Sequence, residues 1–281
     1  MTAKKLLIGI TALAILSGCR KDDGITGIET ANPVNGVNAV YNYKGFWYNF
    51  MIYKPADLPV NAPLVFVLHG AGEKNLTYYN WGFNAVADTA KFLVCYPQGK
   101  NNVWDRQDHN TTDVLVLKSL AKALQEKYGL SASRTFSCGF SAGACMSYLL
   151  AMDANDVFKA IACISGNISD NVWNDKPSAT TVPCFTIHGT ADDIVPISGG
   201  GYDKAPPTQE IVDYFAKSNK CKPADTLSIS PGTTAFIFKN PTDTKEVWYY
   251  RIKDLGHLWP SMTNNGGFNP CKEIWRFFNK W

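Results

Sequence analysis

A single serine lies between two glycines in the segment CGFSAG, Cys138–Gly143. In a G-x-S-x-G pattern the serine projects from a tight turn, which needs small residues two positions to either side; here these are Gly139 and Gly143. A strand-like apolar run precedes Ser141 and a helix-like run follows it. This strand–turn–helix order is the setting of a nucleophilic serine, and the N–H of Ala142 at the helix start would bind developing negative charge.

A serine hydroxyl needs a base, and histidine is the side chain that is neutral yet accepts a proton near pH 7. The chain has four histidines. In a serine–acid–histidine order along the chain, His69 and His109 are disfavoured because they precede Ser141. His188 closes a strand-like run at the start of an acidic loop. His257, in LGHLWP, leaves room for an acid between itself and the serine, so we predict that it is the base.

The acid is expected just past a strand end, in the segment HGTADDIVP, which offers Asp192 and Asp193. A carboxylate there would hold one imidazole tautomer and stabilise imidazolium, while the other aspartate would shape the turn. A second N–H donor for the oxyanion is expected in the loop LHGAG. We assign it to Ala71, with Gly70 as the next choice.

The elements that position these residues alternate between short apolar runs and longer amphipathic ones, which predicts a parallel sheet covered by helices on both faces. Helix 111–129 is expected to be capped by Thr112 or Asp113 and to end at Gly129. Strands are predicted at 63–70, 92–97, 134–140, 158–166, 182–189 and 247–252, and further helices at 142–152, 207–219 and 272–281.

The N-terminus has the features of an export signal. Lys4 and Lys5 precede an apolar run, Leu6–Leu16, which is too short to span a bilayer. Small residues directly before Cys19 resemble the lipobox of bacterial lipoproteins, which implies cleavage before Cys19 and attachment of lipid to its thiol. We therefore expect an outer-membrane lipoprotein, exposed to the periplasm or at the cell surface, that contacts the membrane through this anchor only.

The sequence divides into a signal peptide (1–18), a polar tether (19–36) and one α/β domain (37–281). The chain has 27 basic and 24 acidic residues, a net charge of +3, and loss of Lys4 and Lys5 leaves +1. So small a charge gives no electrostatic reason to expect a nucleic acid partner.

Seven cysteines remain after Cys19, an odd number, so at least one is a free thiol. Cysteines in apolar runs are expected to be buried thiols; these are Cys95, Cys138, Cys163 and Cys184. Cys221 and Cys271 lie in polar stretches and are the candidates for a disulfide.

One polar stretch contains residue types that bind metals. It contains the potential ligands Asp105, Asp108, His109 and Asp113. Because polar residues are common where helices begin, helix capping and a loop beside the substrate are the favoured interpretation. The sequence predicts no metal and no cofactor, since it contains no phosphate-binding loop, dinucleotide fingerprint or zinc-ligand spacing.

Over residues 43–281 the chain resembles a group of α/β-hydrolases that contains polyhydroxybutyrate depolymerases, feruloyl esterases and acetylxylan esterases. This group is carbohydrate esterase family 1 and its relatives. LHGAG resembles the oxyanion loop, GFSAG the nucleophile turn, and GHLWP the histidine motif G-H-x-W-P. HGTADDIVP resembles H-G-x-x-D-x-x-V-P, which selects Asp192 over Asp193. The chain departs from the group at Ala142, where asparagine is common, and lacks the usual cysteine before the histidine loop.

The resemblance implies an α/β-hydrolase fold, a mostly parallel sheet flanked by helices, and a serine esterase with the catalytic residues Ser141, Asp192 and His257. The expected substrate is an acylated plant polysaccharide or its fragments, carrying feruloyl or acetyl groups. Trp259 and Trp104 are candidates to stack on sugar or aryl rings. The alternatives are a polyester depolymerase and a catalytically silent glycan-binding lipoprotein.

Overall fold

The computed structural model describes residues 25–26, 37–223 and 225–281. The predicted signal peptide, Cys19 and most of the tether lie outside the described residues. Two tether residues, Ile25–Thr26, form the short strand β1 and pair with the first strand of the domain. Within the described part of the chain, the structure contains no helix that is both long and apolar enough to cross a membrane.

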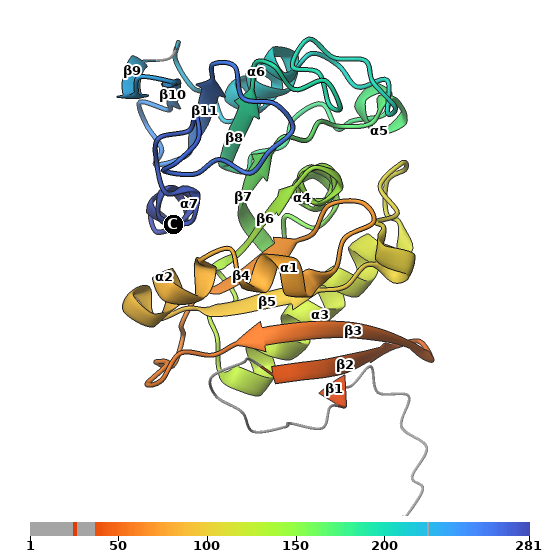
Figure 1. Ribbon diagram of the computed structural model, residues 1–281. Coiled ribbons are helices and arrows are strands. Elements are labelled where there is room, and N and C mark those ends of the chain that lie inside the picture. Colours follow the sequence, from red (N-terminus) through yellow and green to blue (C-terminus); the bar gives the residue numbers. More distant parts are fainter. Residues whose placement is uncertain (1–24, 27–36, 224) are drawn as a thin grey trace, which may run out of the picture.

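In the described ranges, eleven strands form one sheet in the order β1-β2-β3-β5-β4-β6-β7-β8-β11-β10-β9 (Figure 1). Their bounds are β1 (Ile25–Thr26), β2 (Val37–Tyr43), β3 (Phe46–Tyr53), β4 (Leu64–Leu68), β5 (Leu93–Pro97), β6 (Thr135–Phe140), β7 (Phe158–Ile164), β8 (Cys184–Gly189), β9 (Asp225–Ser230), β10 (Thr233–Lys239) and β11 (Glu246–Ile252).

The six central strands, from β5 to β11, run parallel, and the strands at both edges are antiparallel. All six predicted strands are confirmed, since each corresponds to one of these central parallel strands. They were recognisable because strands buried on both faces are continuous apolar runs. The edge strands β2, β3, β9 and β10 were not predicted. For β9 the reason is clear, since most of its residues are exposed and its sequence therefore lacks such a run.

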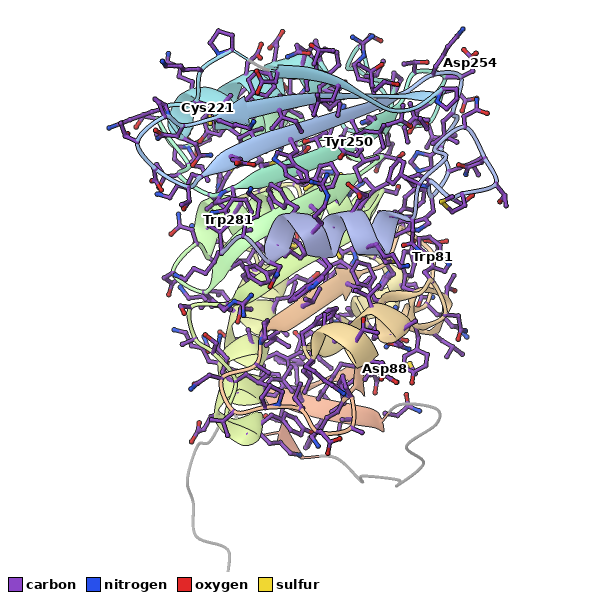
Figure 2. The ribbon with its side chains drawn as sticks, turned by 90° about the vertical axis from the view of Figure 1, so that its left-hand side faces the viewer. Trp81, Asp88, Cys221, Tyr250, Asp254 and Trp281 are labelled. Atoms are coloured by element: carbon purple, nitrogen blue, oxygen red, sulfur yellow. The ribbon has the colours of Figure 1, made fainter. Side chains whose placement is uncertain are left out.

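Helices cover both faces of the sheet. Their bounds are α1 (Asn75–Tyr79), α2 (Phe83–Ala90), the 3-10 turn η1 (Lys100–Asn102), α3 (Thr112–Tyr128), α4 (Ala142–Asp153), α5 (Asp170–Asn174), α6 (Thr208–Ser218) and α7 (Pro270–Phe278). Apolar side chains of α3, α4 and α6 share one hydrophobic cluster, and those of α1, α2 and α7 share the other. Figure 2 shows the second face, where α7 crosses the sheet beside α2.

The start of α3 corrects one prediction. Thr111 is the N-cap, and its hydroxyl accepts the N–H of Val114, whereas Thr112 and Asp113 lie inside the helix. The predicted end is confirmed, since Gly129 adopts a left-handed conformation with φ 62°. Asp113 instead turns back and accepts the N–H of Asp105 at 2.8 Å. In the same stretch, the Nδ1 of His109 lies 2.7 Å from a carboxylate oxygen of Asp153.

The disulfide candidate is wrong. All seven cysteines in the described part of the chain are free thiols. Cys221 packs against the hydrophobic cluster of one sheet face, whereas Cys271 is buried in the cluster of the opposite face. The sheet therefore separates the two sulfurs, which sequence spacing could not reveal. Cys95, Cys138, Cys163 and Cys184 are buried, as predicted.

Candidate active site

Ser141 occupies a strained turn between β6 and α4. Its backbone has φ 54° and ψ −119°, a conformation that residues other than glycine rarely adopt. The two neighbouring glycines are required by close backbone contact. A Cβ at Gly139 would lie 2.3 Å from the carbonyl carbon of Gly143, and one at Gly143 would lie 2.2 Å from the carbonyl oxygen of Leu68. The turn therefore holds Ser141 at the carboxyl edge of the parallel strands, next to the end of β4.

The loops that follow β8 and β11 are joined by backbone contacts. The N–H of Ala191 donates to the carbonyl of Leu255 at 3.0 Å, and a Cβ at Gly189 would lie 2.1 Å from that same oxygen. Parallel strands that are neighbours in a sheet end at the same edge, so these two loops meet there. Asp192 lies on the first loop and His257 on the second.

Asp192 and His257 are in direct contact. The Nδ1 of His257 lies 2.9 Å from Oδ2 and 3.1 Å from Oδ1 of Asp192. Asp192 is buried, whereas the neighbouring Asp193 is exposed. The imidazole of His257 also packs on Phe140, with ring centroids 4.9 Å apart, and Phe140 immediately precedes Ser141. The histidine therefore lies beside the serine turn while its Nδ1 faces the carboxylate.

The carboxylate of Asp192 is held in its charged form. Burial alone would raise its pKa, but hydrogen bonds from His188, from His257 and from the backbone N–H of Val195 outweigh this effect and bring the pKa below its ordinary value. Its Oδ1 accepts the N–H groups of Ile194 and Val195 at 3.1 and 2.8 Å. A carboxylate fixed in this way accepts the Nδ1 proton of imidazole and leaves Nε2 free to accept another.

His188 is a residue of the site that sequence analysis did not assign. It is buried, its Nε2 lies 2.8 Å from the carbonyl oxygen of Val195, and the same nitrogen lies 3.4 Å from Oδ2 of Asp192. Because a carbonyl oxygen only accepts, Nε2 of His188 carries the proton. The position of His188 at the start of the HGTADD segment was a signal for this role, since it precedes the aspartate by one short turn.

The loop His69–Gly72 lies against the serine turn. The N–H of Gly70 is used within the fold, because it donates to Oε2 of Glu73 and to the hydroxyl of Tyr78, each at 3.0 Å. This removes Gly70 as the second choice for the oxyanion. Among the described residues, the N–H groups of Ala71 and Ala142 donate to no partner. The structure thus leaves both free to donate to a substrate oxygen.

His69 packs beneath this loop and hydrogen-bonds to its backbone. Its Nδ1 donates to the carbonyl of Gly70 at 2.7 Å, and its Nε2 accepts the N–H of Gly99 at 2.9 Å. Both ring nitrogens are therefore used by the backbone. Burial lowers the pKa of His69, more than the nearby groups that raise it, and so favours the neutral ring.

Of the two tryptophans proposed for substrate contact, Trp104 is wrong. It is only 5% exposed, it belongs to the hydrophobic core, and its indole N–H donates to the carbonyl of His69 at 2.8 Å. Trp259 remains a candidate because it is partly exposed two residues after His257. It packs on Trp81, with ring centroids 4.6 Å apart, and edge-on against Phe140. Trp81 and Trp259 thus form an aromatic wall beside Phe140 and His257.

Comparisons with known proteins find similarity to esterases. Residues 97–206, which include Ser141 and Asp192, match the family described as Phospholipase/Carboxylesterase. The chain is 26% identical to a bifunctional acetylxylan esterase/xylanase of Neocallimastix patriciarum, covering 87% of this chain and 35% of that protein. It is 26% identical to a poly(3-hydroxyalkanoate) depolymerase of Paucimonas lemoignei, covering 86% of this chain and 66% of that one.

A feruloyl esterase of Neurospora crassa is 25% identical, with 98% of this chain and 93% of the relative covered. Among solved structures, an acetyl xylan esterase from Aspergillus awamori superposes with a TM-score of 0.65 at 17% identity, covering 92% of this chain and 98% of the other. The chain thus spans about a third of the first relative, two thirds of the second and nearly all of the third. The chain has the α/β-hydrolase fold and is similar to the group that contains feruloyl esterases, acetylxylan esterases and polyhydroxyalkanoate depolymerases.

Proposed function

We propose that the protein hydrolyses esters through Ser141, His257 and Asp192. His257 takes the proton of the Ser141 hydroxyl as the serine oxygen attacks the ester carbonyl, and Asp192 stabilises the imidazolium that forms. The N–H groups of Ala71 and Ala142 bind the oxyanion of the tetrahedral intermediate. His257 then donates its proton to the departing alcohol, which leaves an acyl group on the serine, and water activated by the same histidine releases the acid.

The observation that carries this proposal is the contact of His257 with the buried carboxylate of Asp192, made beside the strained turn of Ser141. A strained backbone and a buried carboxylate both reduce the stability of the fold, so their presence calls for a reason other than stability. Their meeting at the carboxyl edge of the sheet, where α/β proteins bind ligands, favours catalysis over a structural role.

As substrate we propose an acylated plant polysaccharide or its fragments, with feruloyl or acetyl groups. The support is the set of relatives named for acetylxylan and feruloyl esters and the aromatic wall of Trp81 and Trp259 beside His257. Aromatic rings stack on flat aryl groups and on sugar faces. The second candidate, a polyester depolymerase, is favoured by the similarity to the Paucimonas lemoignei enzyme.

The nucleophile is tested with a fluorophosphonate that labels activated serines. We expect the purified full chain to be labelled on the peptide containing Ser141 and the Ser141→Ala variant to be unlabelled. Ser133→Ala, which alters an exposed serine, is the matched control and should label like the parent protein. Equal labelling of the Ser141→Ala variant would overturn the assignment, and an unlabelled parent would favour the catalytically silent glycan-binding alternative.

The substrate class is tested by giving the same preparation methyl ferulate, acetylated xylan and a hydroxybutyrate trimer side by side. We expect a higher kcat/KM for one of the two polysaccharide-type esters. If the trimer has the highest value, the polysaccharide proposal fails and the depolymerase proposal replaces it.

We also infer that the protein is a lipoprotein anchored through Cys19 in the outer membrane. The support is the sequence alone: basic residues, an apolar run and small residues directly before Cys19. Mass spectrometry of the N-terminal peptide, prepared from the native host, tests the inference, and a mature N-terminus without fatty acid would refute it.

A further inference from the structure

One face of the β2–β3 hairpin is open and carries side chains that are unusual for a solvated sheet surface. The register pairs Val40 with Asn49 and Asn42 with Trp47, so these residues share one face. The opposite face carries Tyr41 and other residues that are buried in the core. On the open face the indole of Trp47 is exposed, as Trp47 has 58% of its surface in solvent. Burial in the domain therefore does not explain this tryptophan.

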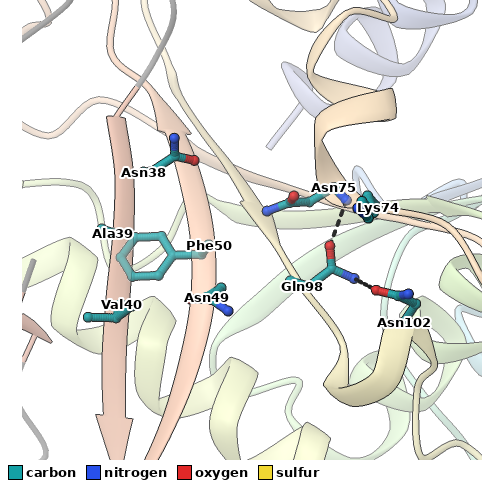
Figure 3. A pocket seen from close by; sticks show the side chains of 9 residues that line it. All are labelled: Asn38, Ala39, Val40, Asn49, Phe50, Lys74, Asn75, Gln98 and Asn102. Atoms are coloured by element: carbon teal, nitrogen blue, oxygen red, sulfur yellow. Dashed lines mark hydrogen bonds between the residues drawn. The ribbon is translucent and has the colours of Figure 1, made fainter. Parts of the chain in front are cut away.

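Two adjoining cavities extend from this face, and we refer to them together as the amide groove. The first has a volume of about 570 Å³ and lies between the hairpin and the start of α1 (Figure 3). The second, of about 300 Å³, reaches Trp47 and the exposed Phe46 at the hairpin tip. They share three lining residues, which makes them one continuous surface; these are Asn49, Gln98 and Asn102.

The floor of the amide groove is fixed by its own hydrogen bonds. Oε1 of Gln98 accepts the backbone N–H of Asn75 at 2.9 Å, and Nε2 of Gln98 donates to Oδ1 of Asn102 at 3.2 Å (Figure 3). The side chain of Asn75 donates to the carbonyl of Tyr96 at 2.9 Å. A surface that is already ordered loses little conformational freedom when a ligand binds to it.

Other amides of the groove remain open to a ligand. Among the described residues, the side chains of Asn38, Asn49 and Asn101 make no hydrogen bond, and each offers two N–H donors and one acceptor. No acidic residue lines either cavity, and the charged lining residues are Lys74 and Lys100. Free amides suit hydroxyl groups, which both donate and accept hydrogen bonds, and exposed aromatic rings suit the flat faces of sugar rings.

The segment that lines the amide groove is hydrogen-bonded to the loop His69–Gly72 of the candidate active site. The N–H of Gly72 donates to the carbonyl of Asn102 at 2.7 Å, and the N–H of Gly99 donates to the buried ring of His69 at 2.9 Å. The segment that lines the groove therefore also holds the loop that contains Ala71. A long substrate whose ester group reaches the loop containing Ala71 can extend from there into the amide groove.

We propose that the amide groove binds the sugar main chain of the polysaccharide whose acyl group is presented to Ser141. This inference rests on the proposed esterase function. Trp47 stacks on a sugar ring, and Asn38 and Asn49 bind hydroxyl groups of the neighbouring units. The groove acts in substrate binding and takes no part in the chemical step.

The test separates binding from catalysis. Titration calorimetry with xylohexaose, which carries no ester, measures binding to the full chain and to the Trp47→Ala and Asn49→Ala variants. We expect each variant to raise the dissociation constant roughly tenfold, as the loss of one good contact does. The control is Leu227→Ala, which alters a residue of similar exposure (52%) on the opposite edge strand, β9, and should bind like the parent protein.

The same proteins are then compared on 4-nitrophenyl acetate, too small to reach the groove, and on acetylated xylan. We expect Trp47→Ala to raise KM roughly tenfold on the polymer and to leave the small ester unaffected. If the parent protein does not bind xylohexaose, or if Trp47→Ala binds it equally well, the inference is wrong. It is also wrong if Trp47 is needed for binding to phospholipid vesicles and not to the sugar.

Failure of the proposed function has a different signature. A parent protein that binds xylohexaose through Trp47 and hydrolyses neither ester would refute the esterase proposal and leave the groove as a glycan site. A parent protein that hydrolyses both esters with no effect of Trp47→Ala would refute the groove and leave the esterase intact.

Discussion

Replacement of Asp192 by asparagine has an outcome that the hydrogen bonds of the site specify. Oδ1 of Asp192 accepts two backbone N–H groups, from Ile194 and Val195, so an asparagine would keep its carbonyl oxygen at that position. Its NH₂ group would then occupy the position of Oδ2, which faces Nδ1 of His257 at 2.9 Å. Because the NH₂ group only donates, it would place the imidazole proton on Nε2. The ring would then be unable to accept the proton of Ser141.

The expected loss is large. Forcing the wrong tautomer in a serine–histidine–aspartate site of another fold lowers turnover by about 10⁴. We expect a fall of about 10³- to 10⁴-fold in kcat/KM for the Asp192→Asn variant, or about 4–5 kcal/mol of transition-state stabilisation at 1.36 kcal/mol per factor of ten. The matched control is Asp193→Asn, which changes an exposed carboxylate on the same turn and should stay within a factor of about two.

The assay is the hydrolysis of 4-nitrophenyl acetate at pH 7.5, with thermal melts to check that both variants fold. The pKa of Asp192 is lowered in the folded protein, so the stability that its ionised form contributes is present above about pH 4 and is lost as the pH falls further. Protonation of Asp192 therefore does not account for a loss of activity between pH 7 and pH 5. The reasoning is refuted if the Asp192→Asn variant keeps a tenth of the parent activity, or if Asp193→Asn loses as much.

Three further outcomes are expected. Gly143→Ala should lower kcat/KM about 10²-fold and the free energy of unfolding by about 1–3 kcal/mol. The reason is that its Cβ would lie 2.2 Å from the carbonyl oxygen of Leu68, where ordinary contact begins at 3.4 Å. A variant that is fully active in an esterase assay would contradict this. His188→Ala should lower kcat roughly tenfold with KM little changed, because the loop that contains Asp192 loses its contact with Nε2 of His188. His188→Gln should recover part of this loss, because its side-chain N–H can replace that contact. Equal rates in the parent protein and both variants would show that His188 does not position the aspartate. Cys19→Ser should abolish lipidation and leave the protein in the soluble fraction or as precursor, as fractionation and mass spectrometry would show; a lipidated variant would rule Cys19 out.

The central fold was predictable from sequence because its information is local. Strands buried on both faces must be apolar throughout, and glycines must lie two positions from Ser141 where β6 and α4 nearly touch. Chain order then selected His257, and a family motif selected Asp192. The structure brings these two residues into contact. The roles of Ser141, His257 and Asp192 in the reaction stay predictions until the variants are measured.

Other features depend on which segments meet in space, and no local pattern encodes this. Trp104 looked like a substrate residue but lies in the core, because the loop after β5 folds back beneath His69. Cys221 and Cys271 both lie in polar stretches of the sequence, yet the sheet separates them in the fold. His188 acquired a partner only when the turn after β8 brought Asp192 back to it.

The open face of the β2–β3 hairpin depends partly on the local sequence and partly on the tertiary structure. The sequence by itself determines that β2 and β3 carry asparagines and aromatic residues, and that alternate side chains of a strand point to opposite faces. Only the register of the hairpin decided that Trp47 shares a face with Asn42 and Asn49, and only the packing of α1 left a cavity beside them. A strand's pattern fixes which residues lie together on a face, whereas the neighbours that cover or leave open that face come from distant parts of the chain.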